Sequence, residues 1–139
     1  MLFGQEHVER YRETDGEEGH DWQGTSVLIL TTTGHRSGES RSTPLIYGTR
    51  GDDYVVVASK GGAPEHPAWY LNLSASPEVE VQVKGDRFPA RARTATAEEK
   101  PELWSTMVEQ WPKYDEYQIK TDREIPVVVL AKRSVPERT

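Results

Sequence analysis

The sequence predicts a mainly β fold, a small and partly closed antiparallel barrel with helices covering its ends. Roughly six segments have strand character and most are joined by short turns, as in small barrels. Repeated strand–helix–strand crossovers are missing, which disfavours a doubly wound parallel sheet. The segment 78–84 alternates strictly between valine and polar residues, the pattern of a half-buried strand.

The first three strands follow one another closely along the chain. An aliphatic and β-branched run begins at Val27 and stops at Gly34, and Pro44 restricts the second strand to an edge or a first position. A tight turn at Gly51 leads into the third strand. Short connections of this kind predict an antiparallel meander. The expected strands are residues 26–33, 42–49, 54–58, 78–84, 87–96 and 126–130.

Two helices are expected between the strands. Pro67 suits the first position of a short helix over residues 68–73. A second helix begins near Lys100, carries an apolar stripe through Leu103 and Met107, and ends before Pro112.

The bulk composition predicts one globular domain over residues 25–139, preceded by an acidic segment, residues 1–24, that forms a helix or stays flexible. The net charge of −6 argues against a general nucleic-acid binder. The chain has no cysteine, which excludes disulfides and thiolate nucleophiles. It shows neither a signal-peptide pattern nor an apolar run long enough to span a bilayer, so a cytoplasmic location is expected.

Two glycine-containing segments suggest an anion site. The turn from Gly34 to Arg41 offers backbone N–H groups together with the guanidinium groups of Arg36 and Arg41. The segment 58–62 places Lys60 before two glycines, which lets the backbone approach a flat or phosphorylated ligand. A solvated hairpin loop and a plain turn are the alternatives. In a meander, however, both segments lie at the same end of the sheet.

Aromatic side chains offer a second set of candidates. Trp69, in the expected helix 68–73, is more often a core residue than a ligand contact, and Asn72 could cap the helix or bind a ligand. Tyr114 and Tyr117 lie on one side of any helical turn and could cover a pocket, although core packing explains them equally well. The four histidines lack metal-ligand spacing, and no built-in nucleophile is present, so a bound cofactor is expected to carry the chemistry.

Several of these segments, taken in order, resemble the deazaflavin-dependent nitroreductase family of actinobacteria. The resemblance covers nearly the whole chain, from about Gly24 to Leu130. The segments that carry it are residues 30–38, 41–45, 58–62, 67–73 and 125–130.

The resemblance implies a split β-barrel related to the flavin-mononucleotide-binding split barrel, and coenzyme F-420, an 8-hydroxy-5-deazaflavin, as the hydride carrier. The electron acceptor would be a quinone, a nitroaromatic compound or a conjugated carbonyl. By this resemblance Tyr114 and Tyr117 line the substrate side and are the candidate catalytic residues. The implied cofactor-binding residues are Arg36, Ser37, Arg41, Pro44, Ala58, Ser59, Lys60, Gly61, Pro67, Trp69 and Asn72.

Other functions stay open at this point. The same barrel could bind flavin mononucleotide or haem, or it could bind the deazaflavin without catalysis. A homodimer is possible, because related barrels often pair through a sheet face. Some members of the family are membrane-associated, so a position at the inner face of the membrane is a second possible location.

Overall fold

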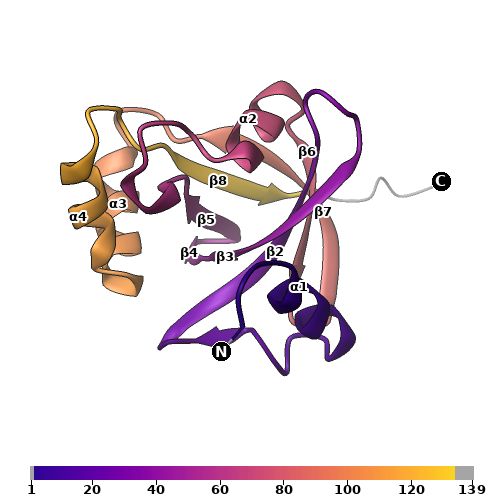
Figure 1. The fold of residues 1–139 in the computed structure, drawn as a ribbon. Helices are drawn as coiled ribbons and strands as arrows, with labels where there is room; N and C mark the ends of the chain where they lie inside the picture. Colours follow the sequence, from indigo (N-terminus) through magenta and orange to yellow (C-terminus); the bar gives the residue numbers. More distant parts are fainter. Residues whose placement is uncertain (1, 134–139) are drawn as a thin grey trace.

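Eight strands form one antiparallel sheet that curls into a half-barrel in the computed structural model, which describes residues 2–133 (Figure 1). The order along the sheet is β1-β2-β6-β7-β8-β5-β4, and β3 pairs with β2 along residues 27–33. The strands are β1 (Asp21–Trp22), β2 (Thr25–Thr33), β3 (Ser40–Ile46), β4 (Gly48–Arg50), β5 (Asp53–Val57), β6 (Glu78–Val83), β7 (Asp86–Thr94) and β8 (Val127–Lys132).

The expected three-strand meander is wrong in one respect. β2 and β3 form the predicted antiparallel pair, with Ile29 opposite Pro44. The chain then breaks at Tyr47, and β5 pairs with the short β4 on one side and with β8 on the other. β5 is apolar on both faces, because Val56 contributes to one buried cluster and Val55 to another. Such a strand belongs inside the sheet, between two partners.

Within residues 2–133, four α-helices and one 3-10 turn accompany the sheet: α1 (Gly4–Glu13), η1 (Lys60–Gly62), α2 (Ala68–Ala75), α3 (Lys100–Gln110) and α4 (Lys113–Lys120). α3 and α4 lie side by side at one edge of the molecule, while α1 lies beside β2 away from them (Figure 1). α4 is absent from the sequence expectation. Pro112 does end α3, but its φ of −55° also suits the start of a new helix.

Two apolar clusters use opposite faces of the same strands. Val128 and Leu130 of β8 point into the barrel, where they meet Leu28 and Phe88. Val127 and Val129 point the other way, toward α3 and α4. This double burial explains why β8 is apolar from Val127 to Ala131 instead of alternating.

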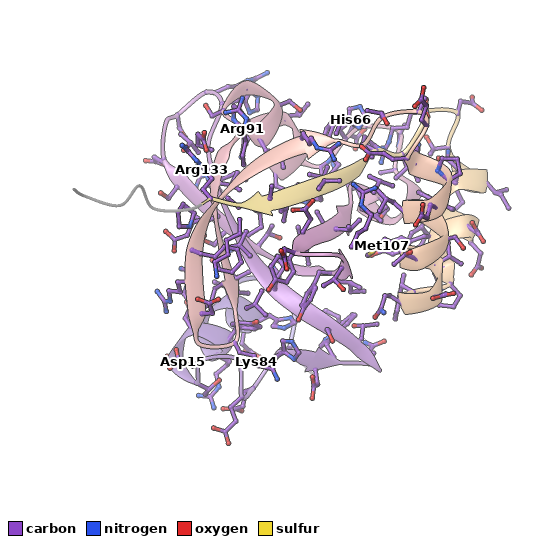
Figure 2. The ribbon with its side chains drawn as sticks, turned by 180° about the vertical axis from the view of Figure 1, so that it is seen from behind. Asp15, His66, Lys84, Arg91, Met107 and Arg133 are labelled. Carbon is purple, nitrogen blue, oxygen red and sulfur yellow. The ribbon has the colours of Figure 1, made fainter. Side chains whose placement is uncertain are left out.

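α1 covers the outer face of β2 and lies against β3, and Tyr11 reaches the turn after β6. Val8 and Tyr11 pack against Ile29, and the Tyr11 hydroxyl donates to the Val27 carbonyl at 2.9 Å and accepts from the Lys84 N–H at 2.7 Å. Burial raises the pKa of Tyr11 to about 12, so this phenol stays protonated. Asp15, in the loop after α1, lies beside Lys84 at the β6–β7 turn (Figure 2).

The β6 strand shows one departure from the expected alternation. Gln82 lies on the face assigned to solvent, yet only 3% of its surface is exposed. It pairs with Ile29, the residue that α1 covers, so the helix buries this part of the outer face. The mainly β half-barrel with flanking helices is otherwise as predicted. No helix among residues 2–133 is long and apolar enough to cross a membrane.

Candidate active site

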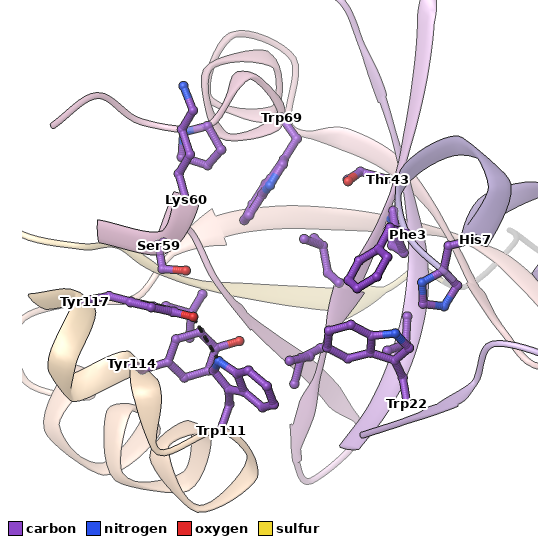
Figure 3. A pocket seen from close by; sticks show the side chains of 18 residues that line it. Phe3, His7, Trp22, Thr43, Ser59, Lys60, Trp69, Trp111, Tyr114 and Tyr117 are labelled. Atoms are coloured by element: carbon purple, nitrogen blue, oxygen red, sulfur yellow. Dashed lines mark hydrogen bonds between the residues drawn. The ribbon is translucent and has the colours of Figure 1, made fainter. Parts of the chain in front are cut away.

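Two neighbouring cavities open at the end of the barrel where η1, α2 and α4 meet. The larger one, the main cleft, has a volume of about 510 Å³ (Figure 3). The smaller one, the side cavity, has a volume of about 390 Å³. Thr43 of β3 and Trp69 of α2 line both, so the two cavities adjoin at these side chains.

The structure brings most of the predicted site residues to these two cavities. Ala58 lines neither cavity, because it is fully buried, with its N–H donating to the Pro126 carbonyl. The predicted residues on the main cleft are Pro44, Ser59, Lys60, Gly61, Pro67, Trp69, Tyr114 and Tyr117. Those on the side cavity are Arg36, Ser37, Arg41, Trp69 and Asn72.

The η1 loop supplies the polar wall of the main cleft. Lys60 and Gly61 both have a left-handed backbone, with φ of 46° and 63°. A Cβ added to Gly61 would meet no atom within 4 Å, so a ligand can lie directly against this backbone. The Lys60 ammonium is 3.1 Å from the Glu65 carboxylate, and both side chains are largely exposed. Such a surface pair is weak, and Lys60 can turn toward an anion.

The side cavity depends on a buried amide. The Asn72 Oδ1 accepts from the His35 backbone N–H at 3.0 Å and lies 2.7 Å from His35 Nδ1. Its Nδ2 donates to Thr32 Oγ1 at 3.1 Å. The Asn72 amide therefore holds the 34–38 loop against α2, which places Arg36 at the side cavity. Asn72 has the geometry of a residue that shapes the cavity through its neighbours.

Replacing Asn72 with alanine is expected to lower the free energy of unfolding by about 1–3 kcal/mol, because the buried hydroxyl of Thr32 loses its Asn72 partner and the bonds to His35 are lost as well. Urea denaturation measures this change. Ser74→Ala on the same helix is the control, since the Ser74 hydroxyl donates only within its own turn, to the Tyr70 carbonyl. A similar loss in both variants would show that Asn72 does not hold the loop.

The wall opposite Trp69 is aromatic. Tyr114 and Tyr117 contact each other edge to face with ring centroids 6.1 Å apart, and both rings line the main cleft (Figure 3). Burial, and to a lesser extent Tyr117, raises the pKa of Tyr114 far above its usual value, so its phenol stays protonated. The Trp111 Nε1 donates to the Tyr117 hydroxyl at 3.3 Å, which leaves the Tyr117 proton free for another acceptor.

The N-terminal segment also reaches the main cleft, which the sequence did not indicate. Phe3, His7 and Trp22 line it together with Trp111. Trp22 contacts Trp111 with ring centroids 5.9 Å apart, and Phe3 meets Trp22 at 5.7 Å. Trp22 stands in a polar stretch just before a Gln-Gly turn, and an isolated tryptophan there was the available signal. These rings make that end of the cleft apolar.

Comparison with known proteins assigns the chain to a family. Residues 3–132 match the family described as F420H(2)-dependent quinone reductase. The chain belongs to this family. The expectation of a coenzyme F420-dependent oxidoreductase family is confirmed, whereas the matched family is described by quinone reduction and not by nitro reduction.

Individual relatives agree with the F420H(2)-dependent quinone reductase family. An F420H(2)-dependent quinone reductase of Mycobacterium tuberculosis is 42% identical over 127 residues, which cover 88% of this chain and 85% of the relative. A solved F420-H2 dependent reductase is 45% identical with a TM-score of 0.69, over 75% of this chain and 92% of that one. A structure described as a domain-swapped dimer is 42% identical with a TM-score of 0.73, over 91% of this chain and 95% of that one.

More distant structures share only the fold. A pyridoxamine 5'-phosphate oxidase-like protein of Listeria innocua is 12% identical with a TM-score of 0.55, over 78% of this chain and 84% of that one. This similarity confirms the split-barrel fold class that was expected from the sequence.

Proposed function

We propose that this member of the family binds coenzyme F420 in the main cleft and transfers a hydride from its reduced form to a quinone. Nitroaromatic compounds and conjugated carbonyls are the other proposed acceptors. The observation that carries the proposal is the juxtaposition of the open η1 backbone at Ser59–Gly61 with the phenols of Tyr114 and Tyr117 in one cleft. Among the described residues of this cleft, no serine or threonine hydroxyl bonds a histidine or carboxylate that would activate it, so a bound carrier is expected to supply the chemistry.

The residues present fit this cofactor. It is a long anion with a flat ring, and the two adjoining cavities offer a flat aromatic wall at Trp69 and basic groups at Lys60, Arg36 and Arg41. The open space beside Gly61 admits a ring or a phosphate close to the backbone. Pro44 and Pro67 complete the wall around Trp69. Reduced coenzyme F420 supplies the hydride when it is bound.

The chain itself aligns the reactants and polarises the acceptor. Trp22 and Trp111 close the apolar end of the cleft, where a quinone ring can pack. Tyr117, whose proton is free, donates a hydrogen bond to the acceptor oxygen as negative charge develops there. Tyr114 lies beside it as a second phenol that burial keeps protonated.

Replacing Tyr114 and Tyr117 together with phenylalanine is expected to lower kcat by about 10- to 100-fold, because the developing charge loses its donors. Affinity for coenzyme F420 should stay close to wild type, since Lys60 and the arginines remain. Steady-state rates with menadione and equilibrium titrations measure the two quantities. Tyr70→Phe is the matched control, because its hydroxyl bonds Thr94 outside the cleft. Unchanged turnover in the double variant would remove the proposed donor role.

Titration with oxidised coenzyme F420 tests the proposal as a whole, with flavin mononucleotide in parallel. Trp69 and Trp111 line the cleft, so quenching of intrinsic tryptophan fluorescence reports its occupancy. Saturable micromolar or tighter binding to coenzyme F420 alone is the expected result. Binding to flavin mononucleotide alone would keep the barrel and replace the cofactor. Tight coenzyme F420 binding without oxidation of the reduced form by any quinone would indicate a non-catalytic binding protein.

Two further proposals concern the setting of the enzyme. We propose a homodimer, which the description of a 42% identical structure as a domain-swapped dimer supports. We also propose that the protein acts in the cytoplasm, a reducing compartment that suits a chain without cysteine. Light scattering after size exclusion measures the first, and cell fractionation measures the second.

A further inference from the structure

We propose that Arg123 is a positioning residue that sets the shape of the η1 loop and thereby the affinity for the anionic cofactor, an inference that rests on the proposed function. Arg123 lies in the segment between α4 and β8, and it was not among the residues singled out from the sequence. It stands behind the loop and lines neither cavity.

The Arg123 guanidinium binds both ends of the loop. Its Nε donates to the Ala63 carbonyl at 2.8 Å, its Nη1 to the Ala58 carbonyl at 3.2 Å and its Nη2 to the Ser59 carbonyl at 2.7 Å. The Ser59 carbonyl also accepts from the Gly62 N–H at 2.9 Å, which closes the turn. Three carbonyls that bracket the loop are thus tied to one rigid, planar group.

The direction of these carbonyls decides where the loop presents its donors. No cis peptide bond is present in residues 2–133, so each N–H points opposite to the carbonyl of the same peptide unit. With the carbonyls of Ala58 and Ser59 turned toward Arg123, the N–H groups of Ser59 and Lys60 point away from it. Ser59 has a right-handed backbone, with φ of −81°, and Lys60 a left-handed one, with φ of 46°, and successive N–H groups in this combination form an anion-binding concavity.

Most hydrogen bonds of the Arg123 guanidinium go to the backbone around η1. Within residues 2–133 its guanidinium forms no salt bridge with a carboxylate. Its fourth contact is His66 Nδ1, 3.2 Å from Nη1. Burial and the neighbouring Arg123 charge lower the pKa of His66, so the imidazole stays neutral and its Nδ1 accepts the bond. Behind the loop, Lys120 adds a second cation, with its Nζ 3.3 Å from the Gly61 carbonyl.

Two variants of the full chain test this role. Arg123→Gln removes the charge and the planar set of N–H donors, and Arg123→Lys keeps the charge while losing this planar set of donors. We expect Arg123→Gln to weaken coenzyme F420 binding by about 10- to 100-fold and Arg123→Lys by about 5- to 20-fold. Hydrogen exchange of the amides of residues 59–62 should become faster in both unliganded variants. Arg91→Gln is the control, because Arg91 pairs with Glu78 on the exposed face of β7.

The outcomes separate this inference from the proposed function. If the wild type fails to bind coenzyme F420, the proposed function fails, whatever the variants do. If the wild type binds and both variants bind equally well with unchanged loop exchange, the positioning role is overturned. A lower melting temperature with unchanged cofactor affinity would also overturn it, because Arg123 would then be a structural anchor only. Should Arg123→Gln fail to fold, Arg123→Lys decides between these results.

Discussion

Replacing Gly62 with alanine is expected to lower the free energy of unfolding by about 2–4 kcal/mol and to weaken coenzyme F420 binding more than about tenfold. Gly62 has a φ of 83°, which disfavours any side chain. It also lies against α4, since an added Cβ would be 2.7 Å from the Tyr117 carbonyl oxygen and 3.1 Å from its Cα. Backbone atoms cannot turn aside as a flexible side chain can, so the loop or the helix must move.

Gly61 provides a matched control for this variant. Its φ of 63° is also left-handed, but an added Cβ would meet no atom within 4 Å. Gly61→Ala should therefore destabilise only through its backbone conformation, by about 1–2 kcal/mol. Urea denaturation monitored by tryptophan fluorescence measures both variants. Equal losses would mean that the contact between Gly62 and α4 does not constrain the loop.

Replacing Lys60 with alanine is expected to weaken coenzyme F420 binding by about 10- to 100-fold, at about 1.4 kcal/mol per tenfold. Lys60 is the cation on the cleft side of η1, and its ammonium can leave Glu65 for a bound phosphate. The association constant of the wild type for coenzyme F420 should fall as the salt concentration rises, and this dependence should be weaker in the Lys60 variant. Isothermal calorimetry at two salt concentrations measures both effects.

Two controls accompany the Lys60 variant. Lys132→Ala removes a lysine that pairs with Asp86 away from both cavities and should bind coenzyme F420 like the wild type. Glu65→Gln frees Lys60 from its partner and should bind equally well or more tightly. Wild-type affinity after loss of the Lys60 side chain would place the cofactor away from the η1 loop.

The strands were predictable because their signal is local. The alternation of Val79, Val81 and Val83 and the aliphatic run before Gly34 each reflect contacts with one or two buried faces. The pairing of β5 with β8 was not predictable in this way, because the paired residues, such as Val57 and Val127, lie far apart in the sequence. The burial of Gln82 likewise depends on α1, a helix far from it in sequence.

The candidate site likewise has a part that local sequence signals predict and a part that depends on long-range contacts. The glycines near Lys60 and Arg36 mark loops that can bind anions, and the structure places both loops on adjoining cavities. The contacts that hold those loops in place are not marked in the sequence. Asn72 acts through His35, and Arg123 acts through carbonyls that precede and follow η1. Their partners become visible only when distant segments are brought together.

The position of Trp69 between the two cavities has a consequence for the size of ligand that binds well. A molecule that extends past Trp69 is held at two points joined by its own covalent bonds, so its second attachment is intramolecular. Such bivalent binding can exceed that of either half by about 10²- to 10⁴-fold without any new contact. A flat ring without an acidic tail would therefore compete poorly for the main cleft, even when it makes the same contacts there.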